Sequence, residues 1–138
     1  MAGITTRRVV VALDCPDARQ LAEFYASMLG WRIRDEAEYL VWVDVLPPDG
    51  EPGAFALACQ SVPDFRAPTW PDGPIPTQVH LDFYVESIGE AEPAVLAAGA
   101  RRHGHKPSLD GRFVVYLDPV GPRSVSARGE VWPTGQFV

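Results

Sequence analysis

The sequence repeats one pattern in its two halves, and this repeat constrains the fold more than any other feature. Asp17 and Ser87 each open an apolar stretch of helical periodicity that a glycine closes. Gln20 and Glu90 follow these openings at the third position, which is the capping-box pattern of a helix start. The two caps lie 70 residues apart (87 − 17) in a chain of 138. The repeat predicts an α+β fold of two pseudo-symmetric βαβββ modules, whose curved mixed sheet surrounds a cleft and carries its helices outside.

Strand-like and helical segments follow the same order in both halves. Pro93 lies inside the second predicted helix, so either the helix kinks there or its regular part starts near Glu90. In the first half the order is strand, helix and three strands, at 7–14, 17–29, 31–34, 39–46 and 54–61. In the second half the corresponding segments are 78–86, 87–98, 101–105, 112–118 and 123–128.

Between the repeats lies a segment too rich in proline for a central strand or a helix. It contains Phe65 and Trp70, and it is either a stiff connection or a flap whose aromatic side chains close over a ligand or a subunit interface. The predicted organisation is one domain over 1–138, made of module one at 7–61, a linker at 62–77, module two at 78–128 and a tail at 129–138.

Composition limits the function classes that the chain can serve. A hydrophobic content of 46% in 138 residues suits one globular domain, and no apolar run approaches the ~18 residues of a membrane span. The chain starts without a secretion signal, and Cys15 and Cys59 are too isolated for a disulfide framework or zinc knuckle. These features predict a cytoplasmic protein. A net charge of −6 argues against nucleic-acid binding and favours neutral or cationic partners.

Three motifs occur in an order typical of one superfamily. They are Ala22–Tyr25 with Leu29–Trp31, then Val79–Asp82, then Leu117–Gly121. Together they resemble the vicinal oxygen chelate superfamily, which includes glyoxalase I, extradiol dioxygenases and bleomycin-resistance proteins. The amino-acid sequences at 13–17 and 69–72 are similar to those of a glyoxalase-like branch common in actinobacteria. The resemblance implies the duplicated fold, a small-molecule site and a homodimer.

The resemblance also implies where a metal would bind. In metal-using relatives each module supplies a histidine from its first strand and a glutamate from its last. His80 occupies the second histidine position, whereas Val10 occupies the first, and the carboxylate positions fall near Ala54 and Val125. Only one of the four family ligands is kept. We therefore expect no metal ligand set and no cofactor.

Strand alternation assigns the residues that should line the cleft. The apolar residues of the 78–86 strand should pack under the helices, which leaves its polar residues on the cleft side. Trp42 and Tyr116 are placed by aligning Val41–Val43 with Val115–Leu117. The expected cleft residues are Arg8, Asp14, Trp42, Gln60, Trp70, Gln78, His80, Asp82, Tyr84 and Tyr116.

Three functions are compatible with these residues. The first is a metal-independent binding protein that sequesters a small organic ligand, aromatic or cationic, as bleomycin-resistance proteins do by resemblance. The second is a metal-free isomerase, lyase or cyclase in which His80 and Asp82 act as acid–base groups. The third is a metal-dependent lyase or dioxygenase, which the missing ligands disfavour. His80 can also serve only to orient a ligand or satisfy a neighbouring carbonyl.

Overall fold

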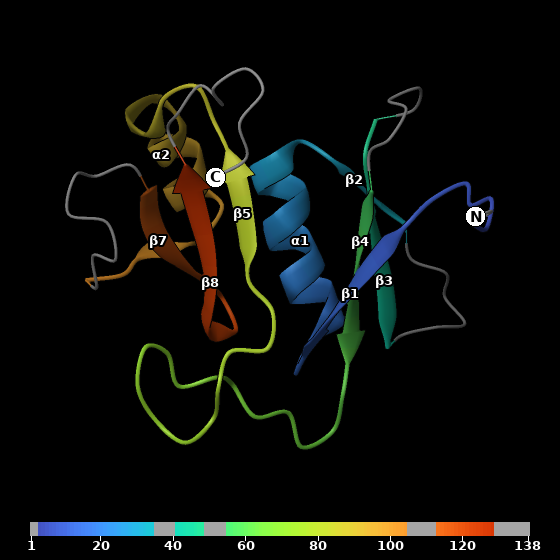
Figure 1. The fold of residues 1–138 in the computed structure, drawn as a ribbon, viewed down its shortest axis with the longest axis horizontal. Helices are drawn as coiled ribbons and strands as arrows, with labels where there is room; N and C mark the ends of the chain where they lie inside the picture. The colour runs from blue at the N-terminus through green and yellow to red at the C-terminus, as the bar shows by residue number, and fades with distance from the viewer. Residues whose placement is uncertain (1–2, 35–40, 49–54, 105–112, 129–138) are drawn as a thin grey trace. The chain divides into compact units, whose positions relative to one another are not determined.

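The protein consists of two compact units, Met1–Phe65 and Arg66–Val138, each built on one mixed sheet. The computed structural model describes residues 3–34, 41–48, 55–104 and 113–128. Within these residues each unit contains one helix and four strands in the same order along the chain (Figure 1). The predicted duplication of a βαβββ module is thus present in the fold.

The first unit is organised around one amphipathic helix, α1 (Ala18–Leu29). Asp17 caps the helix, since its carboxylate accepts a hydrogen bond from the Gln20 amide at 3.1 Å. Gly30 ends the helix with φ 68° and ψ 28°, a left-handed conformation that glycine adopts without a side-chain clash. Six α1 residues are buried, at the spacing of one helix face. They are Ala18, Leu21, Ala22, Phe24, Tyr25 and Ala26.

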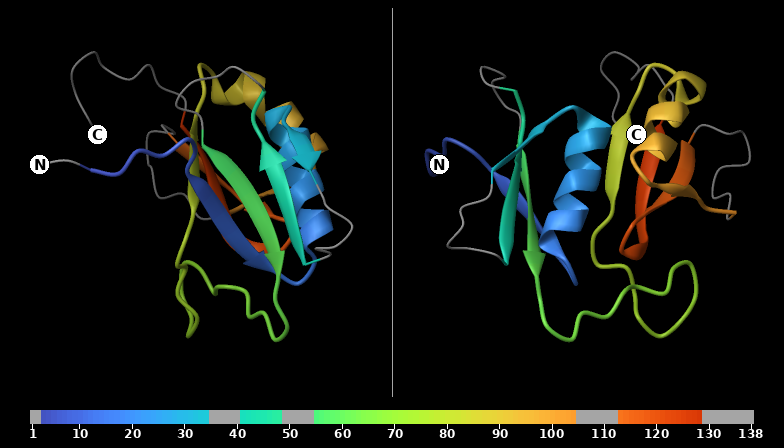
Figure 2. Two further views of the ribbon diagram at one scale, coloured as in Figure 1. Left: turned by 90° about the vertical axis from the view of Figure 1, so that its right-hand side faces the viewer. Right: turned by 180° about the vertical axis from the view of Figure 1, so that it is seen from behind.

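The sheet of the first unit has the strand order β1-β4-β3-β2. Its strands are β1 (Val10–Cys15), β2 (Arg32–Arg34), β3 (Trp42–Leu46) and β4 (Ala56–Ser61). β1 and β4 are parallel, and the other neighbours are antiparallel. Figure 2 shows α1 lying along one face of this sheet. That face supplies the core, with Leu13, Cys15, Val43, Val45, Leu57 and Cys59 buried.

The sheet of the second unit repeats this topology as β5-β8-β7-β6. Its strands are β5 (Leu81–Tyr84), β6 (Arg101–Arg102), β7 (Phe113–Asp118) and β8 (Gly121–Arg128). Again the first strand is parallel to the last, and the remaining pairs are antiparallel. The order of pairing is therefore the same in both units. Topology alone shows the pseudo-symmetry that the two capping boxes predicted.

The helix of the second unit, α2 (Ile88–Ala97), is built less tightly than α1. Ser87 caps it by accepting from the Glu90 amide at 3.2 Å, as predicted. The helix begins at Ile88, so the alternative of a regular start near Glu90 is wrong and Pro93 lies inside the helix. A proline there cannot donate to the carbonyl four residues earlier. Val95 is the one α2 residue that is buried.

Most expected elements are confirmed with shorter bounds. β5 covers Leu81–Tyr84 rather than 78–86, and β6 is limited to Arg101–Arg102 among the described residues. Cys15 and Cys59 are buried free thiols. Neither described helix has the length and hydropathy that crossing a membrane requires. The expected tail at 129–138 and the position near Ala54 lie outside the described residues.

Candidate functional site

Each sheet has one face packed under its helix and a second face, the open face, that the helix of its own unit leaves uncovered. In the first unit the register places Asp14 opposite Gln60 and Gln60 opposite Trp42. Residues paired in register point to the same side of a sheet. Leu13, Cys15 and Val43 point to the helix side. Asp14, Gln60 and Trp42 therefore form one row across the open face. Three of the expected cleft residues are thus brought together.

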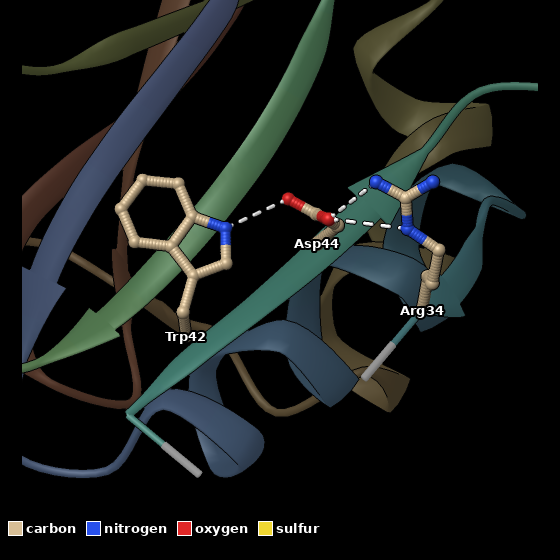
Figure 3. Close-up of polar contacts among 3 residues, drawn as sticks. All are labelled: Arg34, Trp42 and Asp44. Carbon is tan, nitrogen blue, oxygen red and sulfur yellow. Dashed lines mark hydrogen bonds and ion pairs between the residues drawn. The ribbon is translucent and has the colours of Figure 1, made fainter. Parts of the chain in front are cut away.

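A hydrogen-bonded cluster joins Trp42 of this row to Asp44 on β3 and Arg34 on β2 (Figure 3). The indole Nε1 of Trp42 donates to Oδ1 of Asp44 at 2.9 Å. The guanidinium of Arg34 donates to Oδ2 of the same carboxylate, from Nε at 3.3 Å and Nη2 at 2.9 Å. One carboxylate therefore holds an aromatic ring with one oxygen and a cation with the other. We call Trp42, Asp44 and Arg34 the first triad.

Arg34 and Asp44 are not among the cleft residues expected from the sequence. The structure pairs them across the sheet, where their side chains are 55% and 17% exposed. Asp44 stands two residues after Trp42, so strand alternation could have placed both on one face. Arg34 could not be found this way, because its partner depends on the β2–β3 register. Residues 35–40, which follow Arg34, lie outside the described residues.

Small side chains form the sheet surface beside the first triad. Ala12, Ala58 and Asp44 are register partners in the next row, followed by Arg34 on β2. Ala58 is fully buried and Asp44 is mostly buried. Ala12 is exposed.

In the second unit the open face carries His80, Asp82 and Tyr84. His80 precedes β5, and its Nε2 lies 3.8 Å from Oδ1 of Asp82. This distance permits an ion pair but exceeds that of a hydrogen bond. The His80 side chain is 56% exposed, and Tyr84 is also exposed. Asp82 and Tyr84 alternate onto one side of β5, and the grouping of all three residues at a ligand stays a prediction.

Tyr116 does not join them, so the expectation that it lines the cleft is wrong. Its hydroxyl donates to Oε2 of Glu92 on α2 at 2.9 Å, and the residue is fully buried on the helix side of the sheet. Both Asp14 and Tyr84 stand three residues before their helix caps. Following the register from Tyr84 through β8 leads to Phe113, which is therefore the positional counterpart of Trp42.

Tyr116, Glu92 and Arg102 form a second triad with the same chemistry as the first. Arg102 Nη1 donates to both oxygens of Glu92, at 3.2 and 3.3 Å. Burial raises the pKa of Tyr116 to about 12, helped by the hydrogen bond to Glu92 and by the negative charge of that residue, against a lowering by Arg102. The second triad ties α2 to β7 and β6. It stabilises the unit rather than opening a site.

The remaining expected cleft residues lie outside the strands. Arg8 and Gln78 are exposed and precede β1 and β5 respectively. Trp70 packs on His103, with ring centroids 5.3 Å apart. Its loop is closed by three hydrogen bonds between Thr69 and Ile75, at 2.7, 3.1 and 2.9 Å. Trp70 is thus part of a closed loop, and its role at a ligand stays a prediction.

The side chains present do not fit the metal centre of metal-using relatives. No three His, Cys, Asp or Glu side chains come together as a metal site anywhere in the described part of the chain. Val10 and Val125 stand at two of the four implied positions, and an alkyl side chain offers a metal no lone pair. His80 alone among those positions can ligate, and one imidazole is a weak site.

Two mixed sheets of identical topology, each with one helix, define a protein of the vicinal oxygen chelate superfamily. Residues 10–124 match the sequence profile of the glyoxalase-like domain. The chain therefore belongs to the glyoxalase-like domain family. A search of curated proteins found no match.

Solved structures share this fold at low sequence identity. A mutant of the fosfomycin resistance protein FosX from Listeria monocytogenes, complexed with Mn(II) and a dihydroxypropylphosphonic acid, is 11% identical, with a TM-score of 0.62 over 95% of this chain and 92% of that one. TnmS3, an antibiotic binding protein from a Streptomyces species, is 15% identical, with a TM-score of 0.59 over 92% and 98%. YycE from Bacillus subtilis is 14% identical, with a TM-score of 0.61 over 94% of both chains. At these identities the likeness concerns the fold alone.

Proposed function

We propose that this protein binds a small organic molecule with an aromatic ring, and that it does so without a metal ion. The observation that carries the proposal is the open face of the first sheet. There Trp42 stands in one row with Gln60 and Asp14, next to the row that contains the exposed Ala12. Aromatic side chains with a few fixed polar groups are typical of small-molecule sites.

Trp42 is suited to contact an aromatic ring because its orientation is fixed. The indole is half-buried, and its N–H is bonded to Asp44. A ring stacked on such an indole gains ~1 kcal/mol beyond the area it buries. No rotamer freedom has to be lost at binding, which lowers the entropic cost of the complex.

The lost metal ligands and one structural neighbour support binding over metal catalysis. Val10 and Val125 replace ligand positions, and TnmS3 with the same fold is an antibiotic binding protein. Acid–base catalysis by His80 and Asp82 has less support, because the two groups are 3.8 Å apart and His80 is more than half exposed. In this function the chain sequesters its ligand, and the homodimer and cytoplasmic location stay predictions.

Calorimetric titration of flat aromatic natural products, with and without prior treatment with EDTA, tests the proposal. We expect the affinity to be unchanged by the chelator and to fall at least about ten-fold in Trp42→Leu, because ~1.4 kcal/mol of contact is removed. Trp31→Phe is the matched control, since Trp31 contacts Phe55 instead of the first triad. Loss of binding after chelation, or full affinity in Trp42→Leu, would contradict the proposal.

A further inference from the structure

We propose that the ligand of the open face carries a carboxylate or an equivalent acidic group, and that Arg34 binds it while Asp44 acts as a positioning residue for Trp42. This inference rests on the proposed function and adds the class of ligand. It also assigns roles to two residues of the first triad.

The geometry of the Arg34–Asp44 pair leaves one edge of the guanidinium available. Arg34 uses Nε and Nη2, and both donate to the single oxygen Oδ2. The other oxygen of Asp44 is occupied by the indole of Trp42 at 2.9 Å. A guanidinium has five N–H groups, and its Nη1–Nη2 edge matches the two oxygens of a carboxylate. Within the described ranges no side chain accepts from that edge of Arg34, which is 55% exposed.

The carboxylate at the other end of the row, Asp14, lies on β1, three strands away from Arg34 in the sheet order. Three strand spacings amount to ~14 Å, beyond the screening length of ~8 Å at physiological salt. Asp14 therefore has little effect on an anion bound at Arg34.

The separation of Trp42 and Arg34 also suits two contacts with one small molecule. Arg34 is opposite Asp44, and Trp42 is two residues from Asp44 along β3. Two residues of a strand span ~7 Å, so ring and acid must be separated by about the width of a bicyclic aromatic. An aromatic acid fits both contacts. An aromatic cation would meet the guanidinium, so the cationic ligand expected from the net charge is disfavoured at this place.

Asp44 serves this site by fixing two neighbours at once. Its Oδ1 sets the plane of the Trp42 ring, and its Oδ2 holds Arg34 beside that ring. Its side chain is 17% exposed, so water competes little for either bond. Asp44 is a positioning residue, because it acts through Trp42 and Arg34.

Titration with three probes of one shape tests the inference: 2-naphthoate, 2-naphthylmethanol and 2-naphthylmethylammonium. We expect naphthoate to bind at least about ten-fold more tightly than the alcohol, and the ammonium to bind most weakly. Arg34→Gln should remove the preference for naphthoate and leave the alcohol within about two-fold. Arg34→Lys should keep part of the preference, because lysine offers a charge without the fork.

Two variants of Asp44 separate its positioning role from a general effect on folding. The amide oxygen of Asp44→Asn can still accept from Trp42, and the lost negative charge should leave naphthoate affinity equal or higher. Asp44→Leu releases the indole and should weaken both naphthoate and the alcohol. Far-UV circular dichroism checks that each variant is folded.

The outcomes distinguish this inference from the proposed function. If all three probes bind equally and Trp42→Leu weakens each of them, the site stands and the acidic ligand is refuted. Retained preference for naphthoate in Arg34→Gln, or equal losses in the two Asp44 variants, also refutes the inference. If none of the three binds the parent protein, the proposed function fails together with it.

Discussion

The two triads use the same chemistry for opposite purposes. In the first unit Asp44 joins an indole N–H and Arg34, with all three residues on one sheet. In the second unit Glu92 joins the Tyr116 hydroxyl and Arg102, but Glu92 lies on α2. The second triad therefore fastens a helix to a sheet, whereas the first lies within one sheet, on the face opposite α1. The difference lies in which element supplies the carboxylate.

The two helices differ in a corresponding way. α1 buries six side chains against its sheet, while α2 contains Pro93 and buries Val95. A helix with little apolar burial depends more on polar contacts with the sheet. We infer that the second triad compensates for the weak apolar packing of α2, and that α1 needs no such contact.

The largest expected effect is a loss of stability on α1 that has no equivalent on α2. Leu21→Ala should lower the free energy of unfolding by about 3 to 4 kcal/mol, because Leu21 is fully buried and its loss leaves a cavity. Leu96→Ala makes the same change on α2, where Leu96 is 42% exposed, and should cost less than about 1 kcal/mol. Urea denaturation followed by circular dichroism measures both. Equal losses of unfolding free energy in the two variants would show that the two helices pack equally well.

The next effect concerns alkaline pH and the second triad. The pKa of Tyr116 is raised from 10.0 to about 12, so the folded state holds this proton more tightly than the unfolded state. The resulting stability is fully present below pH 10 and is lost as the pH rises through about 12. At most ~2 to 3 kcal/mol is involved. Tyr116→Phe should show a flatter profile in urea denaturation between these pH values.

Trp42→Phe provides the control for this measurement, because it removes the aromatic donor of the first triad without touching a titrating hydroxyl. The unfolding free energy of this variant should change with pH in the same way as that of the parent protein. A parent profile that Tyr116→Phe reproduces would show that folding does not hold the Tyr116 hydroxyl in its protonated form.

The smallest effect compares the two arginines. Arg34 and Arg102 are 55% and 52% exposed, and ion pairs of such groups contribute ~0 to 1 kcal/mol. Arg34→Gln and Arg102→Gln should each change the free energy of unfolding by less than about 1 kcal/mol, and added salt should reduce both effects. If Arg34→Gln cost as much stability as Tyr116→Phe, the first triad would be structural too.

Features that depend on neighbouring residues can be predicted well from the sequence. Asp17 and Ser87 cap the helices as expected, since a cap depends on residues within one turn. Asp14, Gln60 and Trp42 share a face because strand alternation sorted each strand correctly. The bounds of β5 were set too wide, since alternation continues past the point where pairing with β8 stops.

The position of Tyr116 could not be predicted from the sequence. The strand patterns Val-Trp-Val and Val-Tyr-Leu look equivalent, but the register makes Phe113 the counterpart of Trp42. A displacement by an odd number of residues moves a side chain to the other face of a sheet. No local pattern around Tyr116 reveals that its hydroxyl meets Glu92, which lies 24 positions earlier.

The amino-acid sequence by itself determined that the chain is a duplicated βαβββ protein, because caps, apolar periodicity and turn residues act over a few neighbouring positions. Only the tertiary structure decided that Arg34 meets Asp44 and that Tyr116 faces its helix. Both follow from strand register, which is set by the pairing of distant segments and by the packing of their faces.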